Sequence, residues 1–210
     1  MALAITPDSR YAISGSWDHS IRIWDLDDER QMRVIEGHEE RLREVVVTPD
    51  GQYIVASGDD GVVIVWNLAT GQPRIRIRAH EPRPSQTAIL KLSVSPSGRY
   101  LVTAGADNSL KVWDIETGRL LFTDNNTVFD AEFLPQGYLI TGDTSGAVTV
   151  REIETWRILA RFVAESEIYR VAASPDGKTI FAGDRFGYLH FLQLVNLAGE
   201  SAGQLASPTF

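Results

Sequence analysis

The chain alternates short runs of apolar residues with clusters of turn-forming residues. Between residues 42 and 78 four such runs follow one another: Leu42–Val47, Tyr53–Ala56, Val62–Trp66 and Ile75–Arg78. They are rich in β-branched and aromatic residues and are separated by Gly, Asp or Pro, which predicts four short strands. No segment keeps a helical period, so we expect an all-β fold.

A proline-centred turn recurs along the same chain. Its prolines are separated by 42, 47, 39 and 40 residues, at Pro7, Pro49, Pro96, Pro135 and Pro175. Proline in the second position of a turn and glycine near the fourth are typical of tight turns. A period of about 40 residues with four strands in each indicates the repeated blades of a β-propeller.

Several motifs at this period resemble the WD-repeat propeller family. The Trp-Asp dipeptide occurs at Trp24-Asp25 and Trp113-Asp114, and Trp66-Asn67 stands in the same place. The Gly-His pair of the family occurs at Gly37-His38, with Ala79-His80 as a degenerate copy. The resemblance covers residues 1 to about 195 and implies an array of about five four-stranded WD-type blades.

In that family a histidine, a Ser or Thr, an Asp and a Trp form a buried polar network in each blade. Such groups need partners, so a complete set stabilises the blade. The matching residues are His80, Thr103, Asp107 and Trp113 in the third blade, His38, Asp60 and Trp66 in the second, and Ser14, Asp18 and Trp24 in the first. In the second blade Ala56 stands at the hydroxyl position, and Ser57 is one residue away.

The last two blades depart from this pattern. Arg151 replaces the Trp beside Thr141, and in the fifth blade Leu192 replaces it without an Asp at the matching spacing. We expect these blades to depend on apolar packing. Ser or Thr, His and Asp are also the components of a catalytic triad, but one active site does not recur at every blade. We predict no catalytic residue, no cofactor and no metal site.

The predicted blades occupy residues 1–38, 39–80, 81–124, 125–164 and 165–195, the last without its outer strand. Residues 196–210 are rich in Gly, Ala and Ser and predict a flexible tail. Because family propellers commonly have seven blades, we expect these five to be part of a larger, seven-bladed propeller, so that these blades alone form an open ring. Alternatively, five blades close on themselves. An open ring predicts exposed apolar surface on the outer blades and self-association through their edges.

Five residues are candidates for binding a partner. The resemblance implies a top face, formed by the hairpins between second and third strands and by the loops between blades. Trp17 and Asp59 precede the hairpin Asp there, and exposed Trp is enriched at binding hot spots, although its ring could instead lie on the next blade. Arg41 and Arg43 suit an acidic partner or are ordinary solvated charge. Arg83 lies in a proline-rich insertion that is either a binding loop or neutral.

Composition narrows the functional classes. The 210 residues are 43% hydrophobic, carry a net charge of −8 and include no cysteine. This excludes disulfides, cysteine-bound zinc and thiol catalysis, and it disfavours a nucleic-acid binder. Arg74, Arg76 and Arg78 alternate as on an outer strand whose charges face water. No run approaches the roughly 18 apolar residues of a membrane span. We expect a cytoplasmic protein that binds neither membrane nor nucleic acid.

The functional interpretation is a non-catalytic scaffold for an unidentified protein partner. One alternative is a sensor: residues 182–192 resemble the closing repeat of propeller sensors in bacterial signalling ATPases, although the chain has no phosphate-binding loop. A second is an enzyme with a central funnel. That needs polar residues on the first strands, where only Asp130 and Glu132 stand out, and a solvated channel wall is favoured there over a cation site.

Overall fold

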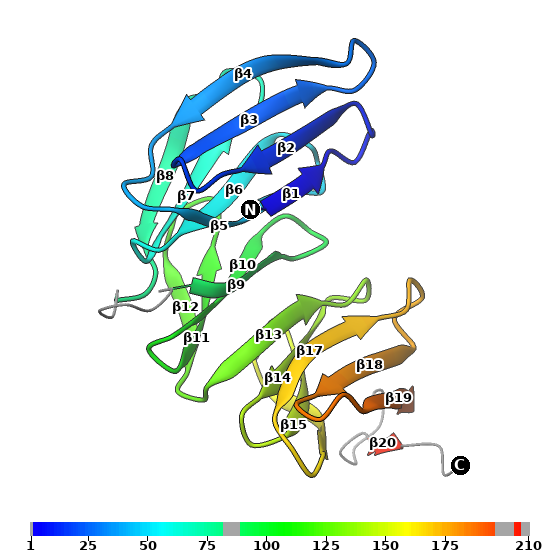
Figure 1. Ribbon diagram of the computed structural model, residues 1–210. Helices are drawn as coiled ribbons and strands as arrows, with labels where there is room; N and C mark the ends of the chain where they lie inside the picture. The colour runs from blue at the N-terminus through cyan, green and yellow to red at the C-terminus, as the bar shows by residue number, and fades with distance from the viewer. Residues whose placement is uncertain (1, 82–88, 196–203, 207–210) are drawn as a thin grey trace. The chain divides into compact units, whose positions relative to one another are not determined.

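The computed structural model describes residues 2–81, 89–195 and 204–206 (Figure 1). Within these residues every regular element is a strand, and consecutive strands pair antiparallel into five sheets of four strands. The predicted all-β fold of about five four-stranded blades is confirmed. We number the sheets blades 1 to 5 in chain order.

The strands follow the predicted runs closely. Blade 1 consists of β1 (Ala2–Ile5), β2 (Tyr11–Gly15), β3 (Ser20–Asp25) and β4 (Arg30–Glu36). Blade 2 consists of β5 (Leu42–Val47), β6 (Tyr53–Gly58), β7 (Val62–Asn67) and β8 (Pro73–Arg78). Blade 3 consists of β9 (Ile89–Val94), β10 (Tyr100–Gly105), β11 (Ser109–Asp114) and β12 (Leu120–Asp124).

The remaining strands form the last two sheets. Blade 4 consists of β13 (Val128–Phe133), β14 (Tyr138–Asp143), β15 (Ala147–Glu152) and β16 (Ile158–Val163). Blade 5 consists of β17 (Ile168–Ala173), β18 (Thr179–Asp184), β19 (Leu189–Val195) and β20 (Gln204–Ala206). The chain divides into two compact units, Met1–Asp124 with blades 1 to 3 and Asn125–Phe210 with blades 4 and 5.

The recurrent proline turn joins the first two strands of a blade and is closed by a hydroxyl group. Thr48 Oγ1 donates to Asp50 Oδ1 at 2.5 Å and accepts from the Tyr53 amide at 3.0 Å. Gly51 in this turn has a φ of +70°, in the left-handed region that glycine adopts without steric cost. This bonding explains why Ser or Thr stands before proline in four of the five turns.

Apolar cores lie between consecutive blades of each unit. One joins isoleucines of blade 1 to the Trp66 side of blade 2, and another joins valines of blade 2 to the Trp113 side of blade 3. In the second unit Val148 and Val150 of blade 4 belong to one core with Leu192 of blade 5. We call the face of a blade that packs on the preceding blade, or corresponds to it, its leading face, and the other its trailing face.

Acidic side chains on trailing faces link the first strands of neighbouring blades. Glu44, the third residue of β5, accepts from the Leu92 amide of β9 at 2.6 Å and from Lys91 Nζ at 2.7 Å. Asp130, the third residue of β13, accepts from the Val171 amide of β17 at 3.0 Å. Asp130 is buried, so the solvated channel wall expected at Asp130 and Glu132 is wrong for Asp130.

The outer strand of blade 5 also corrects a prediction. β20 pairs with β19 as the fourth strand of the sheet, with Leu205 opposite Leu194. The expectation that this blade lacks an outer strand is therefore wrong. Edge pairing is made by main-chain groups, so a composition poor in β-branched residues conceals it. The rest of the predicted tail, residues 196–203 and 207–210, lies outside the described residues.

Candidate functional site

Blade 3 holds a continuous chain of hydrogen bonds that links His80, in the segment after β8, to β10, β11 and the hairpin between them. The Trp113 indole N–H donates to Thr103 Oγ1 at 3.0 Å, and Thr103 Oγ1 lies 2.8 Å from His80 Nε2. His80 Nδ1 lies 2.9 Å from Asp107 Oδ1, which also accepts from the Ser109 hydroxyl at 2.6 Å. The structure brings together all four residues that the sequence assigned to this blade.

The donors in this chain set the protonation of His80. Because an indole N–H only donates, Thr103 accepts from Trp113 and turns its own proton toward His80 Nε2. Nδ1 then carries the imidazole proton and donates it to Asp107. Burial lowers the pKa of His80 below its usual value, although Asp107 opposes that shift. His80 is therefore neutral at pH 7 and acts as a structural link.

Each imidazole lies against a glycine that sequence reasoning did not single out. A Cβ on Gly105 would lie 2.1 Å from His80 Nδ1, and one on Gly58 would lie 2.8 Å from His38 Nδ1. Both glycines end the second strand of their blade, just ahead of the hairpin Asp. The usable signal is a Gly two residues before that Asp.

Blade 2 has the same arrangement without the hydroxyl. His38 Nδ1 lies 3.2 Å from Asp60 Oδ2, and the His38 ring centroid is 5.5 Å from that of Trp66. Ala56 holds the hydroxyl position, and His38 Nε2 has no hydrogen-bond partner among the described residues. Ser57 does not substitute for it, because its buried Oγ likewise has no partner in that part of the chain.

Blade 1 keeps two separate pairs of its assigned residues. The Trp24 indole N–H donates to Ser14 Oγ at 2.9 Å. Asp18 accepts from the Ser20 hydroxyl at 2.6 Å and from Arg22 at 2.7 Å. The Arg22 guanidinium and the Ser20 bonds hold the pKa of Asp18 well below its usual range. The two halves of the network are thus present here without a described imidazole between them.

Two buried aspartates in the last blades escaped the sequence analysis. Asp143 and Asp184 end the second strands of blades 4 and 5. Each accepts, through Oδ1, from the amides of the second and fourth residues that follow it, at 2.9 to 3.0 Å. They stand nearer the strand than the hairpin Asp of blades 1 to 3, so the expected spacing passed over them. The apolar packing expected of these blades is present in their shared core, and the two aspartates close their hairpins in addition.

The recurrence of these sheets and hairpins agrees with a comparison against protein families. The family described as WD domain, G-beta repeat matches residues 1–25, 29–67 and 71–114, about half of the chain. The chain belongs to the WD-repeat family. Its sheets are WD-type blades of a propeller fold. A comparison with curated proteins finds no match. The family match ends in blade 3, so the resemblance of the last WD blade to ATPase sensors stays a prediction.

Four of the predicted contact residues gather on the top face of WD blades 1 and 2. Arg41 Cζ lies 5.3 Å from the centroid of the Trp17 ring. Arg43 donates from Nε and Nη2 to the two carboxylate oxygens of Asp59, at 2.7 and 2.8 Å. The hydrogen bond that Arg43 donates to Asp59 raises the pKa of Arg43. We call Trp17, Arg41, Arg43 and Asp59 the top-face patch.

Two backbone bonds lie beneath this patch, one between the two WD blades and one at the start of blade 2. The Leu42 amide donates to the Ser16 carbonyl at 3.2 Å, and the Asp59 amide donates to the Arg41 carbonyl at 3.0 Å. The Trp17 side chain is 56% exposed, so its ring contacts the next blade through Arg41 without being buried on it. The fifth candidate, Arg83, lies outside the described residues.

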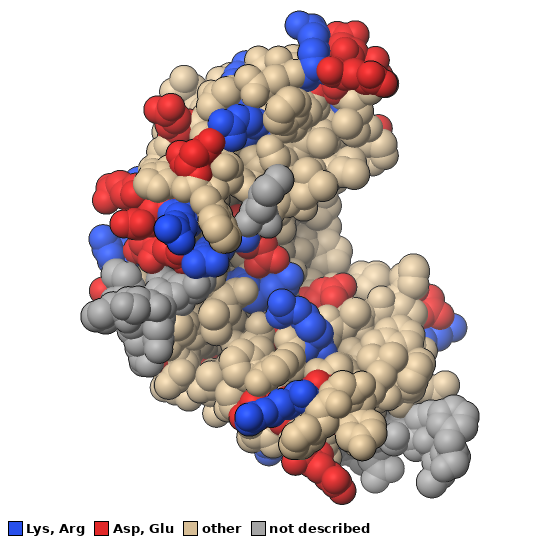
Figure 2. All heavy atoms as spheres, viewed as in Figure 1, with Lys and Arg blue, Asp and Glu red and all other residues tan. Residues whose placement is uncertain are grey.

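Charged groups elsewhere on these WD blades mostly meet their opposites. Figure 2 shows acidic and basic side chains next to one another over the visible surface. Arg76 donates to the Gly37 carbonyl and to Glu39, and the Arg74 Cζ lies 4.8 Å from the Tyr53 ring. Arg74 and Arg76, two of the three alternating arginines of β8, are thus engaged within the protein, which accounts for them without a nucleic-acid ligand.

The described residues lack two kinds of feature. No three His, Asp or Glu side chains gather there as they do around a metal ion. Nor does this part of the chain contain a helix of the length and apolar character that a membrane span requires.

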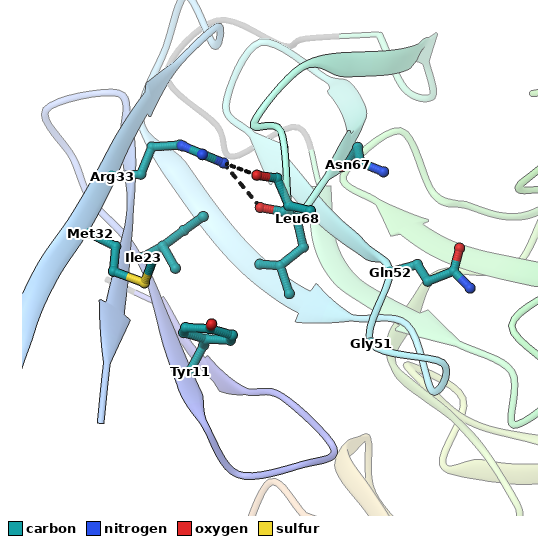
Figure 3. A pocket seen from close by; sticks show the side chains of 9 residues that line it. Tyr11, Ile23, Met32, Arg33, Gly51, Gln52, Asn67 and Leu68 are labelled. Atoms are coloured by element: carbon teal, nitrogen blue, oxygen red, sulfur yellow. Dashed lines mark hydrogen bonds between the residues drawn. The ribbon is translucent and has the colours of Figure 1, made fainter. Parts of the chain in front are cut away.

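A cavity of about 480 Å³ lies between WD blades 1 and 2, at the end opposite the top face (Figure 3). Tyr11, Met32 and Arg33 line it from blade 1, and Leu68 lines it from blade 2. Arg33 Nη1 donates to the carbonyls of Leu68 and Ala69 at 3.2 and 2.8 Å. Its guanidinium therefore reaches across the mouth of the cavity instead of filling it.

The cavity follows from one exchange in the apolar pattern. The position of Arg33 corresponds to Ile75 in blade 2, which is partly buried in the core shared with blade 3. An isoleucine fills such a gap, whereas a guanidinium seeks carbonyl partners at its edge. Sequence reasoning missed this cavity, and Arg33 in place of an aliphatic residue was the available signal.

Proposed function

We propose that this WD-repeat chain is a non-catalytic scaffold that binds a protein partner through the top-face patch. The exposure of Trp17 carries the proposal. A large apolar ring that remains 56% exposed beside an arginine is the kind of side chain that dominates protein interfaces. The family match supports a role in protein interaction.

The two arginines of the patch have different roles. Arg43 is held by both oxygens of Asp59, so its charge is already paired and it acts as a strut. Arg41 contacts the Trp17 ring, and no carboxylate pairs with it among the described residues. Its guanidinium therefore offers donors to an incoming carboxylate. The partner segment that fits carries an acidic side chain beside an apolar one.

The patch is held in place before any partner arrives. Trp17 lies in a hairpin closed by Asp18, which accepts from the Ser20 amide and hydroxyl. The backbone bonds beneath the patch connect that hairpin to the start of β5. Binding to a preformed surface avoids the entropic cost of ordering a loop. This supports recognition by the patch as it stands.

A selection of displayed peptides on the full chain tests the proposal. We expect selected peptides to pair an acidic with an apolar residue, and Trp17→Ala to weaken their binding at least tenfold. Arg41→Ala should weaken acidic peptides in the same way, with a smaller loss for Arg41→Lys. Leu26→Ala is the matched control, because Leu26 is exposed in the turn after β3, at the opposite end of blade 1.

The proposal is overturned by peptides that bind equally well to the wild-type chain and to both the Trp17→Ala and Arg41→Ala variants. Peptides lost only with Leu26→Ala would move the interface to the opposite face. Titration calorimetry with one selected peptide measures each difference.

A further inference from the structure

The leading face of blade 1 is a core surface left open. Leu3 of β1 is 70% exposed, whereas Val45 and Leu92, which hold the same place in β5 and β9, are buried. Trp24 is 36% exposed, whereas Trp66 and Trp113 are buried. Each buried residue is covered by the blade that precedes it.

Two more apolar side chains extend the open face. Ile5 lies two residues after Leu3 and across the sheet from Ala12 and Trp24, and Val34 lies across from Arg22. Ile5 and Val34 are both exposed. We call Leu3, Ile5, Trp24 and Val34 the open leading face. Lone exposed apolar residues are ordinary, but four on one sheet face indicate a docking surface.

The trailing face of blade 5 is open in the complementary way. Leu189 and Phe191 of β19 are 55% and 42% exposed, while Val148 and Val150, which hold the same places in β15, are buried. Phe181 lies beside Phe191 on the same face, with ring centroids 5.3 Å apart. We call Phe181, Leu189 and Phe191 the open trailing face.

A glycine gives an independent measure of this opening. Gly142 is the fifth residue of β14 in blade 4. A Cβ added to it would lie 2.5 Å from the Ile168 side chain of blade 5. The corresponding Gly183 in β18 has no atom within 4 Å of such a Cβ. The place that Ile168 fills in front of blade 4 is empty in front of blade 5.

We propose that a second copy of this chain docks on these faces, with the open trailing face of one copy against the open leading face of the other. The pairing follows the rule that the chain applies internally. At the blade 2–blade 3 contact, trailing valines such as Val63 and Val65 meet the leading Leu92 and Trp113. Phe191 and Leu189 hold the places of those valines, and Trp24 and Leu3 hold the places of the leading residues.

The docked contact lacks one element of the internal contacts. Glu44 and Asp130 each bond to an amide of the next blade, but the same position in blade 5 holds Arg170. A guanidinium does not accept a hydrogen bond. The contact between copies therefore rests on apolar burial, so we expect association that is reversible and dependent on concentration. Because it joins unlike faces, it adds copies head to tail.

Light scattering and sedimentation of the full chain over a range of concentrations test the proposal. The wild-type chain is expected to gain mass as its concentration rises. Leu3→Asp and Phe191→Asp each place a charge on one open face, so each variant alone should be monomeric. Mixed together, the two variants retain one intact face each and should form a one-to-one dimer that grows no further.

Control variants separate this contact from general loss of solubility or folding. Leu120→Asp in blade 3 and Ile158→Asp in blade 4 alter exposed apolar residues outside both faces and should associate as the wild type does. Trp17→Ala should also leave association unchanged, which separates it from the top-face patch. Leu189→Asp repeats the Phe191 test without disturbing the ring pair. Unchanged urea unfolding of each monomeric variant shows that it is folded.

Three results overturn the proposal. A wild-type chain that is monomeric at every concentration has no such contact. Association abolished by Leu3→Asp but unaffected by Phe191→Asp and Leu189→Asp means that two leading faces pair with each other. Variants that fail to form the mixed dimer show that the two faces do not meet.

Discussion

Blades 2 and 3 share nearly the same signature residues, yet only blade 3 completes its polar network. The Gly-His pair is intact in blade 2, at His38, and degenerate in blade 3, at His80. Even so, both ring nitrogens of His80 are bonded, whereas His38 Nε2 has no partner among the described residues. The difference is the hydroxyl of Thr103. Signature dipeptides therefore do not report whether a buried network is satisfied.

Blade 2 relies more on packing. Every residue of β7 from Val62 to Trp66 is buried, and Trp66 lies against the His38 ring. In blade 3 the corresponding strand is β11, where the partly buried Lys111 interrupts the run of buried residues. Lys111 donates to the Ala79 carbonyl at 2.7 Å. Close packing can offset one unpaired imidazole nitrogen, because burial of several aliphatic side chains contributes more than one net hydrogen bond. Blade 3 therefore depends more on hydrogen bonds in its polar network, and blade 2 depends more on apolar packing.

Thr103→Ala is expected to have the largest effect, because it makes blade 3 resemble blade 2 without blade 2's packing. It leaves both His80 Nε2 and the Trp113 N–H buried without their present partner, which costs about 2 kcal/mol of unfolding free energy. Urea unfolding followed by tryptophan fluorescence measures it, because four of the five tryptophans lie in Met1–Asp124. Thr103→Ser keeps the hydroxyl and should lose less. Equal losses for both variants would mean that the methyl group matters and the network does not.

Ala56→Ser sharpens the comparison from the other side by giving blade 2 the missing hydroxyl. A bond to His38 Nε2 should stabilise the unit by about 1 kcal/mol in the same urea experiment. Ala104→Ser is the matched control, since Ala104 follows Thr103 as Ser57 follows Ala56 and is buried. It adds a hydroxyl on the opposite side of the strand and should not stabilise. A gain from the control as large as that from Ala56→Ser would contradict the network account.

The smallest expected effect is a pH dependence that arises from His80. Its pKa is lowered in the folded state by burial, so the unfolded chain binds a proton first as pH falls through about 6.5. Stability should therefore decrease from pH 7.5 to 5.5, by at most about 1.4 kcal/mol per pH unit for this group. Urea unfolding at three pH values measures the slope. His80→Gln should flatten it.

A histidine outside the networks controls that measurement. His19→Asn retains a residue that tolerates the left-handed backbone at this position and should leave the slope as it is in the wild type. Aspartate side chains change the stability of the fold at lower pH than His80 does. The pKa of Asp107 is lowered, since its bonds from Ser109 and His80 outweigh burial, so its contribution is lost only below its usual pKa. An unchanged slope in His80→Gln would remove His80 as the source.

Much of this architecture was predictable because it is periodic. The proline turns are local, so their spacing located the strands, and the resemblance to WD repeats then assigned the third blade's four polar residues. Local spacing failed where an aspartate closes the hairpin from the end of the second strand instead of from within the hairpin, as Asp143 and Asp184 do. It also failed at β20, because main-chain groups make that pairing. At Arg33 it failed because the side chain bonds to carbonyls of another blade instead of filling the core.

The alternation of charge on the first strands restricts how such an array can be lengthened or recombined. Glu44 and Asp130 hold the third position of this strand in blades 2 and 4, and Lys91 and Arg170 hold it in blades 3 and 5. Duplicating blade 2 would set two acids in succession, and deleting blade 4 would set two bases in succession and leave the Val171 amide without its acceptor. Duplicating two consecutive blades preserves the order. Gene duplication and blade exchange in this chain are therefore expected to succeed in steps of two.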